Sequence, residues 1–111
     1  MTLQKKKYLF DILSAAELIL DFISEVDSFA AYTDDNKTKS AVERQLGIIG
    51  EAANKLDKIY PEDSLKHVEQ IIGLRNRIIH AYNNINDAMI WTIVKKHIPE
   101  LLFEVKQKLD S

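Results

Sequence analysis

The sequence predicts an all-α protein that folds as one up-and-down bundle of four to five helices. Several segments repeat apolar residues every three or four positions, and no segment alternates apolar and polar residues over the length of a strand. Only three glycines and two prolines interrupt the 111 residues, so the helices can be long. A chain of this size supports one hydrophobic core, and we therefore expect residues 1–111 to form a single domain.

The composition excludes several classes of protein. With 46% hydrophobic and 29% charged residues, the chain has the balance of a soluble globular domain and is too apolar to be disordered. No stretch without a charged side chain approaches the roughly 20 residues that a membrane helix needs, so we expect no membrane-spanning segment. The net charge of -2 means that any binding of nucleic acid requires a local basic patch.

The cysteine count and the first residues bear on the compartment. Cysteine is absent, which excludes disulfides and thiolate nucleophiles and fits a reducing environment. Three lysines at positions 5–7 precede an apolar run, as in a signal peptide, but Asp11, Glu17 and Asp21 interrupt that run and no cleavage site follows. We therefore expect a cytoplasmic protein.

The first two helices are predicted over about Gln4–Val26 and from about residue 36 to Lys58. The polar residues 34–36 supply caps between them, and Pro61 ends the second helix. The first helix carries a wide apolar stripe: Tyr8, Ile12, Ala15, Ile19, Phe22 and Val26. The second carries a narrower one: Val42, Leu46, Ile49, Ala53 and Leu56.

The third helix is predicted over about Ser64–Ala81 and is the most apolar. Its apolar residues fall on two adjacent lines, so we expect neighbours to surround it almost completely: Leu65, Val68, Ile72 and Ile79, then Ile71, Leu74, Ile78 and Ala81. Asparagines at positions 83, 84 and 86 then make a turn.

The fourth helix is predicted from Asn86 and Asp87, which cap its start, to Leu109. Pro99 lies inside it, and a proline in a helix interior costs about 3 kcal/mol unless the helix bends. We therefore expect two axes, Ala88–His97 and Glu100–Leu109.

All three glycines lie inside helical patterns, where each costs about 1 kcal/mol relative to alanine. Gly47 and Gly50 are three positions apart on one face of the second helix. This spacing predicts the close approach of another backbone, from a neighbouring helix or from a dimer partner.

The densest polar cluster runs from Arg75 to Tyr82, at the end of the third helix. Arginines and a histidine near a helix end commonly serve as caps and ion-pair residues. A second interpretation is chemical, because His80 can shuttle protons near neutral pH while an arginine offers a cation shaped for phosphate. That combination suits metal-free cleavage of RNA.

Arg75, His80 and Tyr82 form a spaced motif. Four residues separate the arginine from the histidine, and one residue separates the histidine from the tyrosine. Further segments over nearly the whole chain are similar to the same family of proteins as this motif: Tyr8-Leu9-Phe10-Asp11-Ile12, Ala41-Val42-Glu43-Arg44, Ile49-Gly50-Glu51-Ala52, Gly73-Leu74-Arg75-Asn76 and Trp91. The chain resembles HEPN domains, specifically the HepT-like RNase toxins of HepT/MntA (type VII) toxin-antitoxin pairs.

The resemblance implies an all-α homodimer whose two motifs face a shared cleft, and a metal-independent endoribonuclease activity without a cofactor. His80 would be the general acid or base, and Arg75 would stabilise charge on the transition state. Asn76 would orient the phosphate or His80. Arg77 would be a further phosphate contact or an exposed ion-pair residue.

The resemblance also implies a partner. In the family, an MntA-like nucleotidyltransferase antitoxin inactivates the toxin by transferring AMP to the motif tyrosine, which here is Tyr82.

Helical geometry separates the two main motif residues. A spacing of five residues turns through about 140°, so Arg75 and His80 do not share a face of an ideal helix. Either the helix is distorted near His80, or the cleft wraps around it and a second subunit supplies the other wall.

Two other functions remain as alternatives. A non-catalytic module could use the same basic residues to bind a nucleotidyltransferase or a nucleotide, and a purely structural dimerisation domain would account for the apolar faces alone. Other candidate residues have simpler roles. His67 and His97 lack metal-ligand spacing, and Trp91 is expected in the core or at a dimer contact. Glu51 could face the cleft or cap a neighbour, but a surface ion pair with Lys55, four residues on, is the simpler interpretation.

Overall fold

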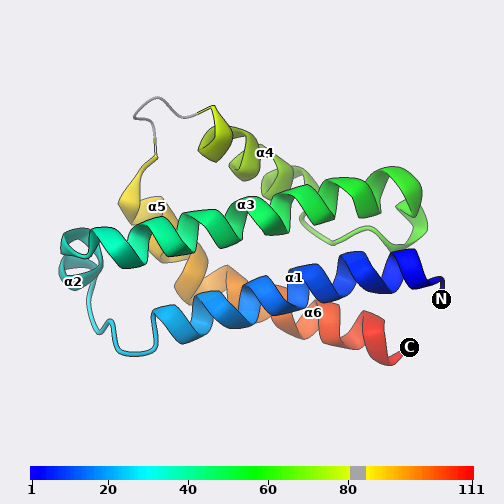
Figure 1. Ribbon diagram of the computed structural model, residues 1–111, viewed down its shortest axis with the longest axis horizontal. Coiled ribbons are helices and arrows are strands. Elements are labelled where there is room, and N and C mark those ends of the chain that lie inside the picture. The colour runs from blue at the N-terminus through cyan, green and yellow to red at the C-terminus, as the bar shows by residue number, and fades with distance from the viewer. Residues whose placement is uncertain (81–84) are drawn as a thin grey trace.

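The computed structural model describes residues 1–80 and 85–111, and within these ranges it contains six α-helices and no strand (Figure 1). The predicted all-α fold is confirmed. The elements are α1 (Leu3–Phe22), α2 (Phe29–Asp34), α3 (Asn36–Ile59), a 3-10 turn (Pro61–Asp63), α4 (Val68–Ile79), α5 (Asp87–Thr92), a π-helical turn (Ile93–His97) and α6 (Ile98–Asp110). Tyr82, the expected site of modification, lies outside the described residues.

Helix α3 occupies the middle of the bundle. It packs against α1 on one side and α4 on the other, and α1 also packs against α6 (Figure 1). Successive long helices run in opposite directions, as an up-and-down bundle requires. Helix α2 packs across one end, against α3 and α5.

The core is built from α1, α3 and the α5–α6 segment. Its fully enclosed side chains include Leu9, Ile12, Ile19, Val42, Leu56, Ile90, Val94 and Val105. Trp91 is half-buried against this core, with its ring centroid 5.3 Å from that of the buried Tyr32, so its expected place in the core is confirmed.

Helix α4 is an exception, because none of its residues is fully buried. Ile71, Leu74 and Ile78 are half-buried against the core, and Ile79 is 52% exposed. The expectation that neighbours surround this helix is therefore wrong for the single chain. The helix that carries the motif lies at the edge of the bundle with apolar surface facing outward.

Side-chain hydrogen bonds explain where helix boundaries differ from the predicted ones. The first helix ends at Phe22, and Ser28 then caps an unpredicted short helix by accepting a bond from the Ala31 N–H. The third predicted helix starts four residues late, because Ser64 donates to Asp57 and the Lys66 N–H donates to Glu104 on α6. These bonds hold residues 64–67, which precede α4, in a non-helical conformation.

The predicted break near Pro99 is confirmed, in the form of a π-helical turn directly before it. The Ile98 N–H donates to the Ile93 carbonyl, one residue further back than in an α-helix. Pro99 then falls in the first turn of α6, where a missing N–H costs nothing. No helix in the described ranges is both long and apolar enough to cross a membrane.

Candidate active site

Arg75 lies where α4 packs tightly against Gly50 of α3. A Cβ added at Gly50 would overlap the Cβ and Cγ of Arg75, so only glycine fits at this position. The predicted close approach at Gly50 is confirmed, and the neighbour is a helix of the same chain. At Gly47 an added Cβ would meet nothing within 4 Å, so the close approach does not extend to that position.

The guanidinium of Arg75 is held by two neighbours. Its Nη2 donates to Oε2 of Glu51 at 2.5 Å, and its Nη1 donates to Oδ1 of Asn76 at 3.1 Å. The Nε is buried and has no hydrogen-bond partner among the described residues. The side chain is 25% exposed, and the bond from its Nη1 to Asn76 lies at the surface.

The sequence interpretation favoured a surface ion pair for Glu51, and the structure shows that its carboxylate also contacts Arg75. The expected ion pair with Lys55 is present, with Nζ 3.7 Å from Oε1, but the other carboxylate oxygen binds Arg75. Nothing in the spacing links residues 51 and 75, which are 24 positions apart. Two signals pointed to this position: the adjacent Gly50, which marked the place where another helix approaches, and the segment Ile49-Gly50-Glu51-Ala52, which carries part of the family resemblance.

His80 ends α4 and is exposed. Its backbone N–H still bonds the Asn76 carbonyl at 3.0 Å, and the helix runs without interruption up to Ile79. The structure therefore does not show the distortion that would bring His80 to the face of Arg75. Among the described residues, no hydrogen bond joins the two side chains.

Asn76 and Arg77 are exposed neighbours of Arg75. The side chain of Asn76 contacts the guanidinium rather than His80. Arg77 directs its Nη1 at the sulfur of Met89, 3.5 Å away on α5, and forms no ion pair with a described residue. Its charge is therefore not neutralised by a described carboxylate.

Apolar side chains frame the pair of Glu51 and Arg75. Ile79 lies one helical turn beyond Arg75 on α4, and Ile48 lies one turn before Glu51 on α3. Ile79 is 52% exposed and Ile48 is 36% exposed. The ion pair thus sits in an outward-facing surface with apolar residues at its margins.

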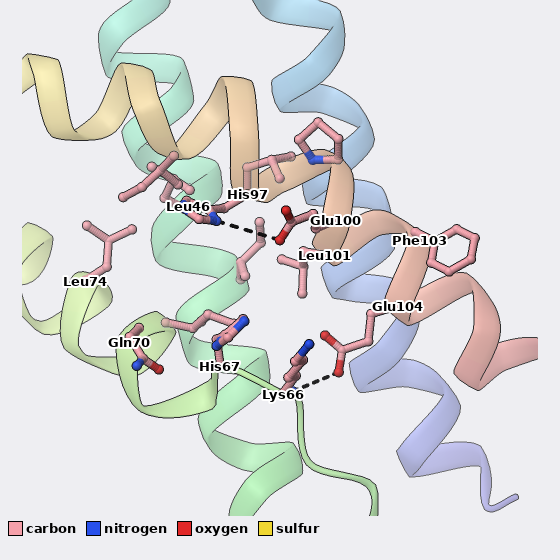
Figure 2. A pocket seen from close by; sticks show the side chains of 15 residues that line it. Leu46, Lys66, His67, Gln70, Leu74, His97, Glu100, Leu101, Phe103 and Glu104 are labelled. Carbon is pink, nitrogen blue, oxygen red and sulfur yellow. Dashed lines mark hydrogen bonds and ion pairs between the residues drawn. The ribbon is translucent and has the colours of Figure 1, made fainter.

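A separate groove of about 960 Å³ lies between α4 and α6 (Figure 2). Leu46 and Ile49 of α3 also line it. Its rim carries charged and polar side chains: Lys66, His67, Gln70, His97, Glu100 and Glu104. On α4 the groove is lined by Gln70, Ile71 and Leu74, so neither Arg75 nor His80 contributes to it. Within the described ranges, no three His, Asp or Glu residues are grouped closely enough to hold a metal ion.

Comparisons with known proteins agree on one family. The family described as "Ribonuclease HepT-like" matches residues 12–107. The "Probable ribonuclease HepT" of Thermococcus cleftensis is 38% identical over 100 residues, which cover 86% of this chain and 87% of that protein.

Two further relatives match this chain over almost the whole length of both proteins. "Putative RNase MJ1380" of Methanocaldococcus jannaschii is 33% identical, over 91% of this chain and 93% of its own. "Putative RNase TTE0752" of Caldanaerobacter subterraneus subsp. tengcongensis is 35% identical, over 96% and 95%. No solved structure matches the chain significantly.

Proposed function

The chain belongs to the HepT-like ribonuclease family, and from that membership we propose that it is an endoribonuclease toxin that cuts RNA without a metal ion. The observation that carries the proposal is the intact motif on an accessible helix. Arg75 is held in place with part of its guanidinium exposed, and His80 is exposed at the end of the same helix. These are the two groups that phosphodiester cleavage needs when no metal supplies charge.

The proposed mechanism uses one residue for protons and one for charge. His80 takes the proton from the ribose 2'-hydroxyl as that oxygen attacks phosphorus, or gives a proton to the leaving oxygen. Arg75 donates hydrogen bonds to the phosphoryl oxygens, where negative charge grows in the transition state. Asn76 and Arg77, next to Arg75 in the sequence, support phosphate binding.

A homodimer completes the proposed site. Positions five apart are separated by about 140° around an ideal helix, and α4 runs without interruption from Arg75 to Ile79. A second copy that covers the exposed apolar surface at Ile48 and Ile79 would bring two motifs into one cleft. The residues that act on one phosphate can then come from both subunits.

Regulation is proposed through the motif tyrosine. An MntA-like nucleotidyltransferase partner would transfer AMP to Tyr82, two residues after His80. The added phosphate would attract Arg75 and occupy the place of the RNA backbone. The toxin would thus be inactivated without being unfolded.

The test is cleavage of a fluorogenic RNA in EDTA. Wild-type protein should cut it, and His80→Ala and Arg75→Ala should each abolish cutting while circular dichroism stays unchanged. His97→Ala is the matched control, because His97 is an exposed histidine outside the motif and should be dispensable. Full activity in a folded His80→Ala protein, or RNA binding without any cleavage by the wild type, would contradict the proposal.

A further inference from the structure

We propose that Glu51 is a positioning residue for Arg75 in RNA cleavage, an inference that rests on the ribonuclease function proposed above. Glu51 lies on α3, outside the sequence motif, and reaches the motif only through the packing of α3 against α4. Its Oε2 accepts a hydrogen bond from Nη2 of Arg75 at 2.5 Å. The role assigned to it is to aim the guanidinium, not to touch RNA.

The hydrogen bonds orient the guanidinium without using up its donors. Each terminal nitrogen of an arginine carries two N–H groups. Nη2 gives one to Glu51 and Nη1 gives one to Asn76, so one N–H on each nitrogen remains for a phosphate. Two fixed contacts also limit the rotation of a side chain that is otherwise costly to immobilise.

The support beneath Glu51 is rigid. Helix α3 is packed between α1 and α4, and neighbouring Ala52 and Ala53 are buried. Gly50 allows Arg75 to lie directly over the α3 backbone, which places the guanidinium within reach of the next residue. A carboxylate mounted on such an element holds its partner more tightly than one on a loop.

Charge balance favours positioning over inhibition. Glu51 alone would cancel the charge of Arg75 and compete with phosphate. However, its second oxygen lies 3.7 Å from the Lys55 ammonium, so the cluster of Lys55, Glu51 and Arg75 retains a net positive charge. Phosphate is therefore still attracted to the exposed side of Arg75.

The opposite role makes an opposite prediction. If Glu51 mainly blocked Arg75 until RNA displaced it, removal of the carboxylate would tighten RNA binding or speed cleavage. If Glu51 positions Arg75, removal slows the chemical step and affects binding less. The sign of the effect distinguishes the two roles.

The experiment is single-turnover cleavage of a fluorogenic RNA with a randomised central stretch. Glu51→Ala should lower the rate at saturating protein by about 10-fold to 100-fold, as expected for a misplaced catalytic group, with a smaller change in half-saturating concentration. Glu51→Gln, which keeps the size and one acceptor oxygen, should recover part of the rate. Glu17→Ala, at an exposed glutamate of α1, is the control and should match the wild type.

A double-mutant cycle shows whether Glu51 acts through Arg75. In an Arg75→Ala background cleavage is lost, so RNA binding is the quantity measured. Adding Glu51→Ala to that background should change the affinity for RNA little. Circular dichroism and melting temperature are measured for every variant, and Glu51→Gln decides the outcome if Glu51→Ala does not fold.

Each outcome decides one question. A wild type that cleaves RNA while both Glu51 variants keep its rate, or exceed it, overturns the positioning role and leaves the ribonuclease function standing. If Glu51→Ala weakens RNA binding measurably, and weakens it as much in the Arg75→Ala background as in the wild type, Glu51 does not act through Arg75 and the positioning role is overturned as well. A wild type that cuts no RNA refutes the proposed function itself, and the positioning role is refuted with it.

Discussion

The Cβ and Cγ of Arg75 occupy the space into which a side chain at Gly50 would extend. This contact sets how closely α4 approaches α3, and it places the guanidinium beside the Glu51 carboxylate. A glycine that looks unfavourable inside a helix is thereby explained by a contact with the proposed catalytic arginine.

Gly50→Ala should lower both stability and RNA cleavage. The added methyl group gains about 1 kcal/mol of helix propensity. The overlap with Arg75 costs more, because overpacking typically costs about 1–3 kcal/mol and here the obstacle includes the arginine Cβ. Urea unfolding and the cleavage assay measure the two effects.

Gly47→Ala is the matched control for Gly50→Ala. An added Cβ at Gly47 meets nothing within 4 Å, so the substitution should raise the unfolding free energy by up to about 1 kcal/mol. If Gly50→Ala were as stable and active as Gly47→Ala, the close contact would not matter for the site.

The protein should be a homodimer, and Ile79→Glu should make it monomeric. A charge placed on the exposed apolar surface beside Arg75 would be costly to bury against a second copy. Light scattering at micromolar concentration measures the mass directly. Phe103→Glu serves as the control, since Phe103 is 66% exposed on α6, away from the motif, and its replacement should leave the dimer intact. A monomeric wild type would count against a shared cleft.

Tyr82 should gain AMP when the protein is incubated with the nucleotidyltransferase partner and ATP. Intact mass and peptide mapping of wild type and Tyr82→Phe test this, and cleavage should fall as modification proceeds. Two of the other tyrosines are restrained in the described structure. Tyr32 is buried, and the Tyr60 hydroxyl is hydrogen bonded to Thr2 and Gln4. Adenylyl mass on another tyrosine, or undiminished mass in Tyr82→Phe, would show that the assignment to Tyr82 is wrong.

Stability should fall in acid partly through Asp35, which caps the start of α3. The Thr38 hydroxyl and N–H donate to its carboxylate at 2.6 and 3.0 Å, and these bonds lower the pKa of Asp35. A carboxylate with a lowered folded pKa stabilises the protein above its unfolded pKa of about 3.9, and this stability is lost as the pH falls through the folded pKa.

Asp35→Asn tests this pH dependence, because it keeps an oxygen for the Thr38 N–H and removes the titration. The melting temperature of the variant should depend less on pH below about pH 4 than that of the wild type. Asp34→Asn is the control, at an exposed neighbour without a side-chain hydrogen bond in the described structure, and should keep the wild-type profile. Parallel acid profiles for wild type and Asp35→Asn would contradict the assignment.

Local pattern in the sequence was enough to predict most of the fold. Apolar spacing of three and four positions predicts the long helices, and the proline at position 99 predicts the break between the last two axes, because both effects act within one or two turns. The motif could also be found in the sequence, as could the need for a close neighbour at Gly50. The non-helical link before α4 was missed, since bonds such as that from the Lys66 N–H to Glu104 join distant segments. Helix α2 was also missed, although the cap that begins it, from the Ala31 N–H to Ser28, is local.

The tertiary structure decided how the site is assembled. Apolar residues around α4 predicted a helix enclosed by neighbours, yet the single chain leaves it at the edge, because periodicity shows which faces are apolar but not whether the same chain covers them. The pairing of Arg75 with Glu51 likewise depends on the packing of α3 against α4, and no local rule relates residues 24 positions apart. The sequence by itself therefore determined which residues form the motif, and only the packing of helices determined which carboxylate holds its arginine.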